Sequence, residues 1–135
     1  MNNLFLYFIF AFIALDILVV VIVFVKRSRK KMSKGDLEFI SDKWTYINQI
    51  VNSNPSKAVI DADKLIDFVL QRKKFSGSFS DKLKASGNLF SDLNSLWSAH
   101  KLRNRIAHEF SEINVNEIKS ALRAYHRALK DLNVL

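Results

Sequence analysis

A short polar cluster near residue 100 has the residue types needed to cleave a phosphodiester. Asn104 directly follows Arg103, and His108 stands five positions after the arginine. Arginine is a permanent cation whose forked donors fit a phosphate group, and histidine both accepts and gives a proton near neutral pH. In RNA the neighbouring 2′-hydroxyl is the nucleophile, so proton transfer and charge stabilisation are sufficient for cleavage. The cluster therefore predicts a phosphodiesterase site that needs no metal and no other cofactor.

The cluster is expected to lie on a long helix over residues 91–110. Apolar residues recur there at helical spacing, at Leu93, Leu96, Trp97, Leu102 and Ile106. His100, Asn104 and His108 are spaced four apart, so they stack along one helix face, with Arg103 about 100° around at its edge. His100 is a weaker candidate, recommended only by this phase. Spacing alone also leaves open a surface or packing role for the arginine and the histidine.

Helical periodicity continues outside this segment. Residues 37–51 carry one apolar stripe and predict the first helix of the domain. A second helix is expected to begin at Pro55, with Asn54 as its N-cap, and to end near Lys73. Asn114, with a glutamate three residues later, predicts the cap of a last helix that runs to the C-terminus.

A short helix completes the predicted domain. Ser80 is expected to cap it over Asp81–Ser86, and Gly87 to end it. No segment of useful length alternates apolar and polar residues, so no strand is expected. The sequence thus predicts an all-α fold, an up-and-down bundle of four main helices plus one short helix over residues 36–135. The acids of the second helix are interpreted as a solvated face: Asp61, Asp63 and Asp67.

The N-terminal quarter of the chain has the composition of a membrane-spanning helix. Leu4–Val25 holds 22 residues, of which 18 are Leu, Ile, Val or Phe and one, Asp16, is charged. A helix of this length spans about 33 Å, enough for a bilayer core of about 30 Å. Residues 1–25 are therefore expected to be a single transmembrane anchor, and not a cleaved signal peptide. Asp16 is either a polar contact between membrane helices or an acid that the apolar helix tolerates.

The basic residues predict the orientation of this anchor. Residues 26–34 contain six cations and no anion, whereas the segment before the helix has no charged side chain. The positive-inside rule places a basic linker, residues 26–35, and the domain after it in the cytoplasm, with the N-terminus outside. The formal net charge of +8 falls to +3 over residues 35–135, where 15 Lys and Arg stand against 12 Asp and Glu. Cysteine is absent, which excludes thiolate chemistry.

The segment Leu102–Glu109 reads Leu-Arg-Asn-Arg-Ile-Ala-His-Glu and resembles the signature of the HEPN superfamily, which is Arg-Asn, three residues and then His. The alanine-bearing second helix and the amphipathic last helix are also similar to that family, so the resemblance covers about residues 36–133. It implies an all-α bundle that forms a homodimer and brings two copies of the motif together. By position in the motif, Arg103, Asn104 and His108 would be catalytic.

The resemblance leaves two functions open. In the first, the chain is a membrane-anchored, cytoplasm-facing endoribonuclease that cleaves RNA as a homodimer, as in toxin–antitoxin systems, with an antitoxin or regulatory protein as its partner. In the second, the domain is not catalytic, and it dimerises and recruits RNA, a nucleotide or a protein to the membrane. Arg105, in the motif spacer, and His100, outside the motif, are expected at most to bind substrate.

Overall fold

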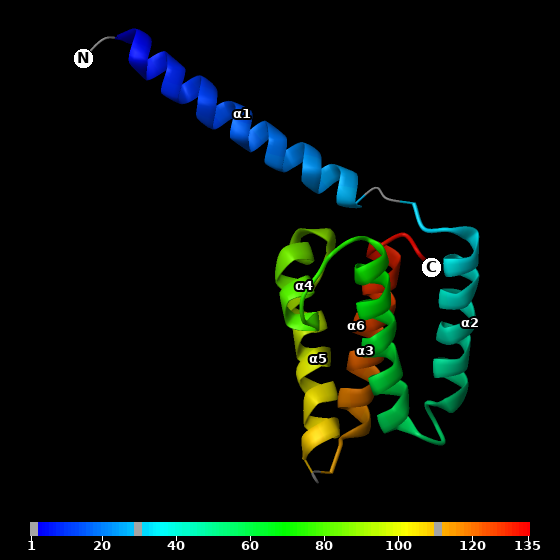
Figure 1. Cartoon of the computed structure of the whole chain (residues 1–135). Coiled ribbons are helices and arrows are strands. Elements are labelled where there is room, and N and C mark those ends of the chain that lie inside the picture. Colours follow the sequence, from blue (N-terminus) through cyan, green and yellow to red (C-terminus); the bar gives the residue numbers. More distant parts are fainter. Residues whose placement is uncertain (1–2, 29–30, 110–111) are drawn as a thin grey trace. The chain divides into compact units, whose positions relative to one another are not determined.

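The computed structural model describes the chain apart from residues 1–2, 29–30 and 110–111, and it describes only the backbone of residues 25–28 (Figure 1). Two compact units make up the chain, Met1–Lys31 and Met32–Leu135. The elements of the described residues are α1 (Asn3–Ser28), α2 (Lys34–Ile50), α3 (Pro55–Arg72), α4 (Phe79–Ser86), the 3₁₀ turn η1 (Gly87–Leu89), α5 (Leu93–His108) and α6 (Val115–Asp131). No strand occurs among these residues, so the predicted all-α class is confirmed.

Helix α1 is long and apolar enough to cross a membrane. Its segment Asn3–Phe24 has a mean hydropathy of 3.0 over its most apolar window. Every described side chain from Asn3 to Val23 is exposed, so none of them belongs to a protein core. The expected apolar N-terminal helix is therefore present. The helical backbone continues past Val25 to Ser28, because the lysine and arginine that follow the apolar run are good helix formers.

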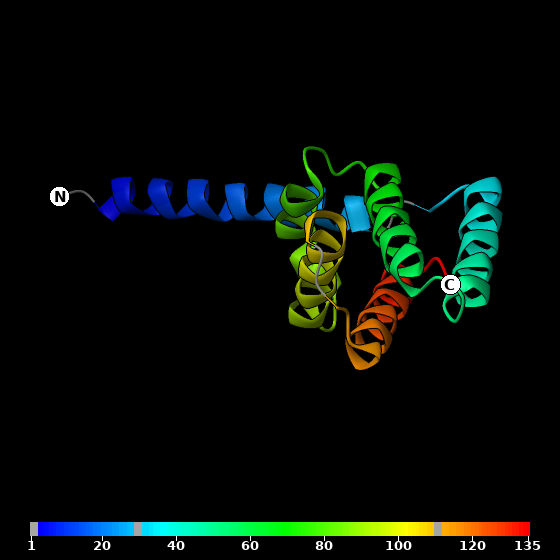
Figure 2. The ribbon, with the colours of Figure 1, turned by 90° about the horizontal axis from the view of Figure 1, so that it is seen from below.

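The second unit is a bundle whose four long helices run alternately up and down (Figure 1). Helix α3 contacts α2, α4, α5 and α6, and α5 also packs against α6. Viewed from below, α3 lies between α2 and the pair formed by α5 and α6 (Figure 2). The predicted up-and-down arrangement is confirmed, and α3 is its central element.

Two predicted helix starts are confirmed in detail. Asn54 caps α3 by accepting a hydrogen bond from the backbone N–H of Lys57, with Pro55 at the first helical position. Asn114 and Glu117 form the capping box of α6. Each cap satisfies backbone donors that have no partner inside the helix. The beginnings of α3 and α6 are therefore set by local sequence.

The predicted start of the short helix was wrong. Its N-cap is Ser78 and not Ser80, because Asp81 completes a capping box with Ser78. Gly77 has a φ of 95°, a left-handed conformation that favours glycine, and it turns the chain just before this cap. Helix α5 is also shorter than predicted, since Asp92 caps it, and the proposed end at Phe110 lies outside the described residues.

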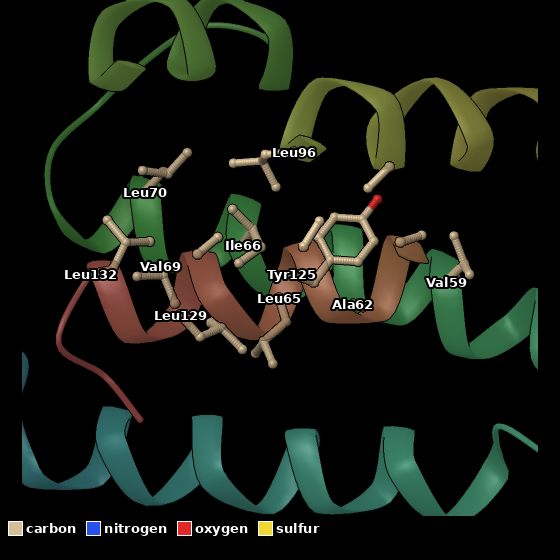
Figure 3. Close-up of a cluster of buried hydrophobic side chains, with 14 of the residues drawn as sticks. Val59, Ala62, Leu65, Ile66, Val69, Leu70, Leu96, Tyr125, Leu129 and Leu132 are labelled. Carbon is tan, nitrogen blue, oxygen red and sulfur yellow. The ribbon is translucent and has the colours of Figure 1, made fainter. Parts of the chain in front are cut away.

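The core of the second unit forms between α3, α5 and α6 (Figure 3). The central helix supplies more of it than any other helix, with Ala58, Val59, Ala62, Leu65, Ile66, Val69 and Leu70 buried. Tyr125 and Leu129 from α6 and Leu96 from α5 pack against this stripe. Burying such a side chain contributes about 1.5–3 kcal/mol. These contacts hold α5, and the residues it carries, in a fixed position against α3.

Candidate functional site

Asp63 is the centre of a buried polar network that joins three helices. Its side chain on α3 is 6% exposed. The Tyr125 hydroxyl of α6 donates to Asp63 Oδ1 at 2.9 Å, and His100 Nδ1 of α5 lies 2.9 Å from the same oxygen. Arg103 Nε lies 3.6 Å from Asp63 Oδ2, which is an ion-pair distance. One carboxylate therefore holds groups from α5 and α6 against α3.

The interpretation of Asp63 as part of a solvated face was wrong. Asp61 and Asp67 are partly exposed and pair with lysines, but Asp63 is buried. The signal was present in the helical phase: residues four before, three after and seven after Asp63 are Val59, Ile66 and Leu70, and all three are fully buried. A charged residue in an apolar stripe indicates a paired, buried group.

The hydrogen bonds of this network fit one assignment of donors and acceptors. Burial, and then the nearby Asp63 charge, raise the pKa of the Tyr125 phenol, which therefore stays a donor. With Asp63 accepting, His100 carries its proton on Nδ1, and its Nε2 accepts from Asn104 Nδ2 at 3.3 Å. Asn104 Oδ1 then accepts from Arg103 Nη1 at 3.0 Å. The donor and acceptor pattern thus assigns the neutral Nδ1–H tautomer to His100 and fixes the orientation of Asn104.

Arg103 is held on one side and open on the other. Its side chain is 27% exposed. Among the described residues its only hydrogen bond is the one to Asn104, and its Nε has none. A guanidinium has five N–H donors, so most of them are left for a ligand. Asp63 and Asn104 therefore orient Arg103 without using up its capacity to bind an anion.

His100 has the opposite character. It is 8% exposed, and the ring of Phe79 meets it edge-on with centroids 4.7 Å apart. Trp97 closes a further side at 6.1 Å. His100 had been expected at most to bind substrate, and the structure places it inside the domain with both ring nitrogens used. Its observed contacts make it a support for Asn104.

A groove of about 460 Å³ lies along the end of α5, beside the start of α6. Three of the predicted site residues line it: Asn104, Arg105 and His108. His108 is exposed, whereas Arg105 Nη2 donates to Glu117 Oε2 at 2.7 Å. This hydrogen bond raises the pKa of Arg105 and lowers that of Glu117. Asn104 is the one predicted residue that belongs to both the groove and the buried network.

The structure thus divides the predicted residues into two neighbouring groups. Arg103, Asn104 and His100 are joined by hydrogen bonds to each other, and Asp63 is hydrogen-bonded to His100 and ion-paired with Arg103. His108, one turn later on α5, forms no hydrogen bond or ion pair with another described residue. Together they place a partly open cation, an oriented amide and an exposed imidazole along one helix. Such a set can bind a phosphoryl group and transfer a proton beside it.

Among the residues that the structure describes, no three His, Asp or Glu side chains lie close enough together to hold a metal ion. Comparisons of the chain with protein-family models, with curated proteins and with solved structures find no significant match. The residues and their geometry alone define the candidate site.

Proposed function

We propose that this chain is a membrane-anchored endoribonuclease that cleaves RNA without a metal ion and whose second unit lies in the cytoplasm. One observation carries the proposal: Arg103 and Asn104 are hydrogen-bonded in place on α5, and Asn104 and the exposed His108 line the same groove. The resemblance of this string to the HEPN signature supports the substrate class. The cations that follow the apolar helix support the cytoplasmic orientation.

In the proposed reaction the ribose 2′-oxygen attacks the adjacent phosphorus while the bond from phosphorus to the 5′-oxygen breaks. The products are a 2′,3′-cyclic phosphate and a 5′-hydroxyl. A base takes the proton of the 2′-hydroxyl, and an acid gives a proton to the leaving 5′-oxygen. His108 performs one of these transfers, and Arg103 holds the phosphoryl oxygens as their charge develops. Asn104 keeps Arg103 in its bound orientation.

A second copy of the chain completes this site in the proposal. The reaction uses an acid and a base, whereas the groove of one protomer contains a single histidine, His108. His100 is not available for proton transfer, because Asp63 and Asn104 occupy its two nitrogens. A homodimer that brings two copies of His108 to one phosphate supplies both groups.

The first test is cleavage of an end-labelled RNA by the full chain in detergent micelles with EDTA. Removing a general acid or base costs about 10²–10⁴-fold in rate, so His108→Ala should lose most of the activity. Arg103→Ala should lose a similar share, because the developing charge is no longer stabilised. His126→Ala and Arg123→Ala on α6 are matched controls, since neither residue lines the groove of His108. Unchanged cleavage by both site variants would contradict the proposal.

The dimer is tested separately by mixing wild-type chain with increasing His108→Ala chain at constant wild-type concentration. If two copies of His108 form the acid–base pair, the mixed dimer is inactive and activity falls as the variant is added. If each protomer works alone, the activity stays constant. The second result would contradict a site shared between two protomers, but it would leave His108 as a catalytic residue.

One observation favours the non-catalytic alternative, in which the domain recruits RNA, a nucleotide or a protein. Arg103 is already paired with Asp63, and Arg105 with Glu117, as expected for cations that stabilise the fold. That alternative predicts no cleavage by the wild-type chain. It also predicts that Arg103→Ala lowers thermal stability, whereas His108→Ala, at an exposed position, does not.

A further inference from the structure

Helices α2 and α3 form a second groove, of about 320 Å³, that the proposed cleavage site does not use. We call it the α2–α3 groove. None of its residues lines the groove of His108. It is lined by Phe39, Lys43, Tyr46, Ile47, Lys57, Asp61, Lys64, Leu65 and Phe68. Three aromatic rings and three lysines thus share one concave surface.

The rings of this groove are open to solvent. Phe39 is 43% exposed and Tyr46 is 39% exposed. Phe39 and Phe68 contact each other across the two helices, with centroids 5.0 Å apart. Exposed rings on a rigid helix pair offer flat faces on which another planar group can stack.

Two of the three lysines of the groove lie over these rings. Lys43 Nζ lies 5.6 Å from the Phe39 centroid and 5.8 Å from that of Tyr46, and Lys57 Nζ lies 5.5 Å from the Tyr46 centroid. Lys57 also pairs with Asp61, the one acid in the lining. Neither Lys43 nor Lys64 forms an ion pair with a carboxylate within the described residues. The groove therefore has an excess of positive charge.

We propose that the α2–α3 groove binds one nucleotide unit of a single-stranded nucleic acid. The base stacks on Tyr46 and Phe39, and the phosphate is held by Lys43 and Lys64. Aromatic platforms interleaved with cations are how proteins hold single strands without reading their sequence. When a base enters, it displaces the Lys43 ammonium from the ring faces, and the flexible lysine stem lets the ammonium move to the phosphate.

The shape of the groove favours this ligand over a lipid surface. A nucleotide fits into a concave site between two helices, whereas a bilayer surface is broad and contacts protruding groups. The inference deepens the proposed function by giving the substrate strand a second point of attachment. It depends on that function only for the identity of the strand as RNA.

Binding is tested with the full chain in micelles of an uncharged detergent and a fluorescent, short 2′-O-methyl oligoadenylate. This probe lacks the 2′-hydroxyl nucleophile, so it cannot be cleaved, and its anisotropy reports binding alone. Tyr46→Ala should weaken binding about tenfold without changing the net charge, and Tyr46→Trp should restore it. Lys43→Glu should weaken binding by at least as much, whereas Lys130→Glu, an equal charge change at an exposed position of α6, should have a small effect.

Several results would overturn the inference. Failure of the wild-type chain to bind the probe is one, and equal losses for Lys43→Glu and Lys130→Glu are another, because the second shows attraction by net charge alone. Lipid docking is tested in nanodiscs. If anionic lipid, and not the oligonucleotide, protects α2 and α3 from hydrogen exchange, the groove faces a membrane and the inference fails.

The two sources of a nucleotide are separated by adding AMP as a competitor. Competition by AMP at concentrations close to those of the oligonucleotide identifies a free nucleotide as the ligand, and weak competition identifies a strand. Both results support the same stacking and phosphate contacts. Cleavage of ordinary RNA by these variants and by His108→Ala separates this inference from the proposed function. If only His108→Ala loses cleavage and Tyr46→Ala binds the probe as the wild-type chain does, the groove inference fails and the proposed function stands.

Discussion

At the residue scale, Asp63 is the buried polar side chain that joins α3 to both α5 and α6. A buried carboxylate is costly unless its oxygens are hydrogen-bonded or paired. Asp63 meets this condition with the Tyr125 hydroxyl, His100 Nδ1 and the Arg103 guanidinium. Because Arg103 and Asn104 are oriented through these contacts, Asp63 is a positioning residue for the candidate site.

Asp63→Ala should destabilise the domain by about 3 kcal/mol, because it leaves the Tyr125 and His100 donors buried without an acceptor. For a domain of this size the melting temperature should fall by more than about 10 °C. The measurement is thermal unfolding of the full chain in micelles, followed by near-ultraviolet circular dichroism. Asp61→Ala is the matched control two residues away, and it should cost less than about 1 kcal/mol, since it removes a partly exposed pair with Lys57. Equal shifts for the two variants would show that the network does not stabilise the fold.

At the element scale, the start of α6 contributes Glu117 to the lining of the candidate groove. Asn114 caps the helix, and Glu117 both completes the capping box and accepts a hydrogen bond from Arg105 on α5. The same carboxylate thus accepts a backbone N–H at the start of α6 and joins α6 to α5. Loss of the cap or of the hydrogen bond from Arg105 should speed hydrogen exchange in the first turn of α6.

Asn114→Ala should cost about 1 kcal/mol, because the backbone donors of the first turn lose their side-chain acceptor. Asn116→Ala is the control on the same helix turn, since the Asn116 side chain is exposed and contributes only its backbone N–H to the cap. Hydrogen exchange of the α6 amides should be faster in the Asn114 variant and unchanged in the control. The same protection in both variants would count against the observed cap.

Stability should also fall in acid. The hydrogen bond from Arg105 lowers the pKa of Glu117, and bonds from Ser95 and Ser78 lower those of Asp92 and Asp81. A carboxyl whose pKa is lower in the folded state stabilises the fold above its unfolded pKa, here about 4. This contribution is lost as the pH falls through the folded value.

The melting temperature of the full chain should therefore be steady at neutral pH and decrease below about pH 4.5. Glu117→Gln should have a lower melting temperature at neutral pH and a smaller decrease in acid, because one of the shifted groups is gone. Glu112→Gln, at an exposed position in the preceding loop, should keep the wild-type profile. If the Glu117→Gln variant has the same acid profile as the wild-type chain, the Arg105–Glu117 pair does not contribute to the loss of stability in acid.

At the scale of the whole molecule, the chain consists of two units that differ in the burial of their side chains. The first is an apolar helix whose described side chains are exposed through Val23, and the second has its own buried core from Ile40 to Val134. No side chain that the structure describes in the first unit belongs to this core. Folding of the bundle should therefore not depend on the apolar helix.

Removing residues 1–31 should leave a chain that is soluble without detergent and that melts within about 5 °C of the full-length protein, since the core is unchanged. Flotation with liposomes and circular dichroism of the two proteins measure both effects. The full chain should float with the vesicles and the shortened chain should not. Loss of the cooperative transition in the shortened chain would show that the bundle needs the first unit.

Much of the fold follows from short-range patterns in the sequence. The apolar run, the helical periods and the caps at Asn54 and Asn114 each depend on residues within a few positions of one another, so they could be predicted. The cap of α4 could not be chosen reliably, because Ser78 and Ser80 are both suitable and Gly77 with Asp81 decides between them.

The candidate site was predictable only in part. Arg103, Asn104 and His108 were identified from their residue types and from their spacing, which is within two turns of one helix. Asp63 is joined to His100 and Tyr125 over separations of 37 and 62 residues, and sequence periodicity does not say which helices will meet. The sequence by itself therefore determined the number and order of the main helices, the apolar segment and the motif. The tertiary structure alone decided that Asp63 is their buried partner and that His100 is a support, because the packing of α3 against α5 and α6 brings those groups together.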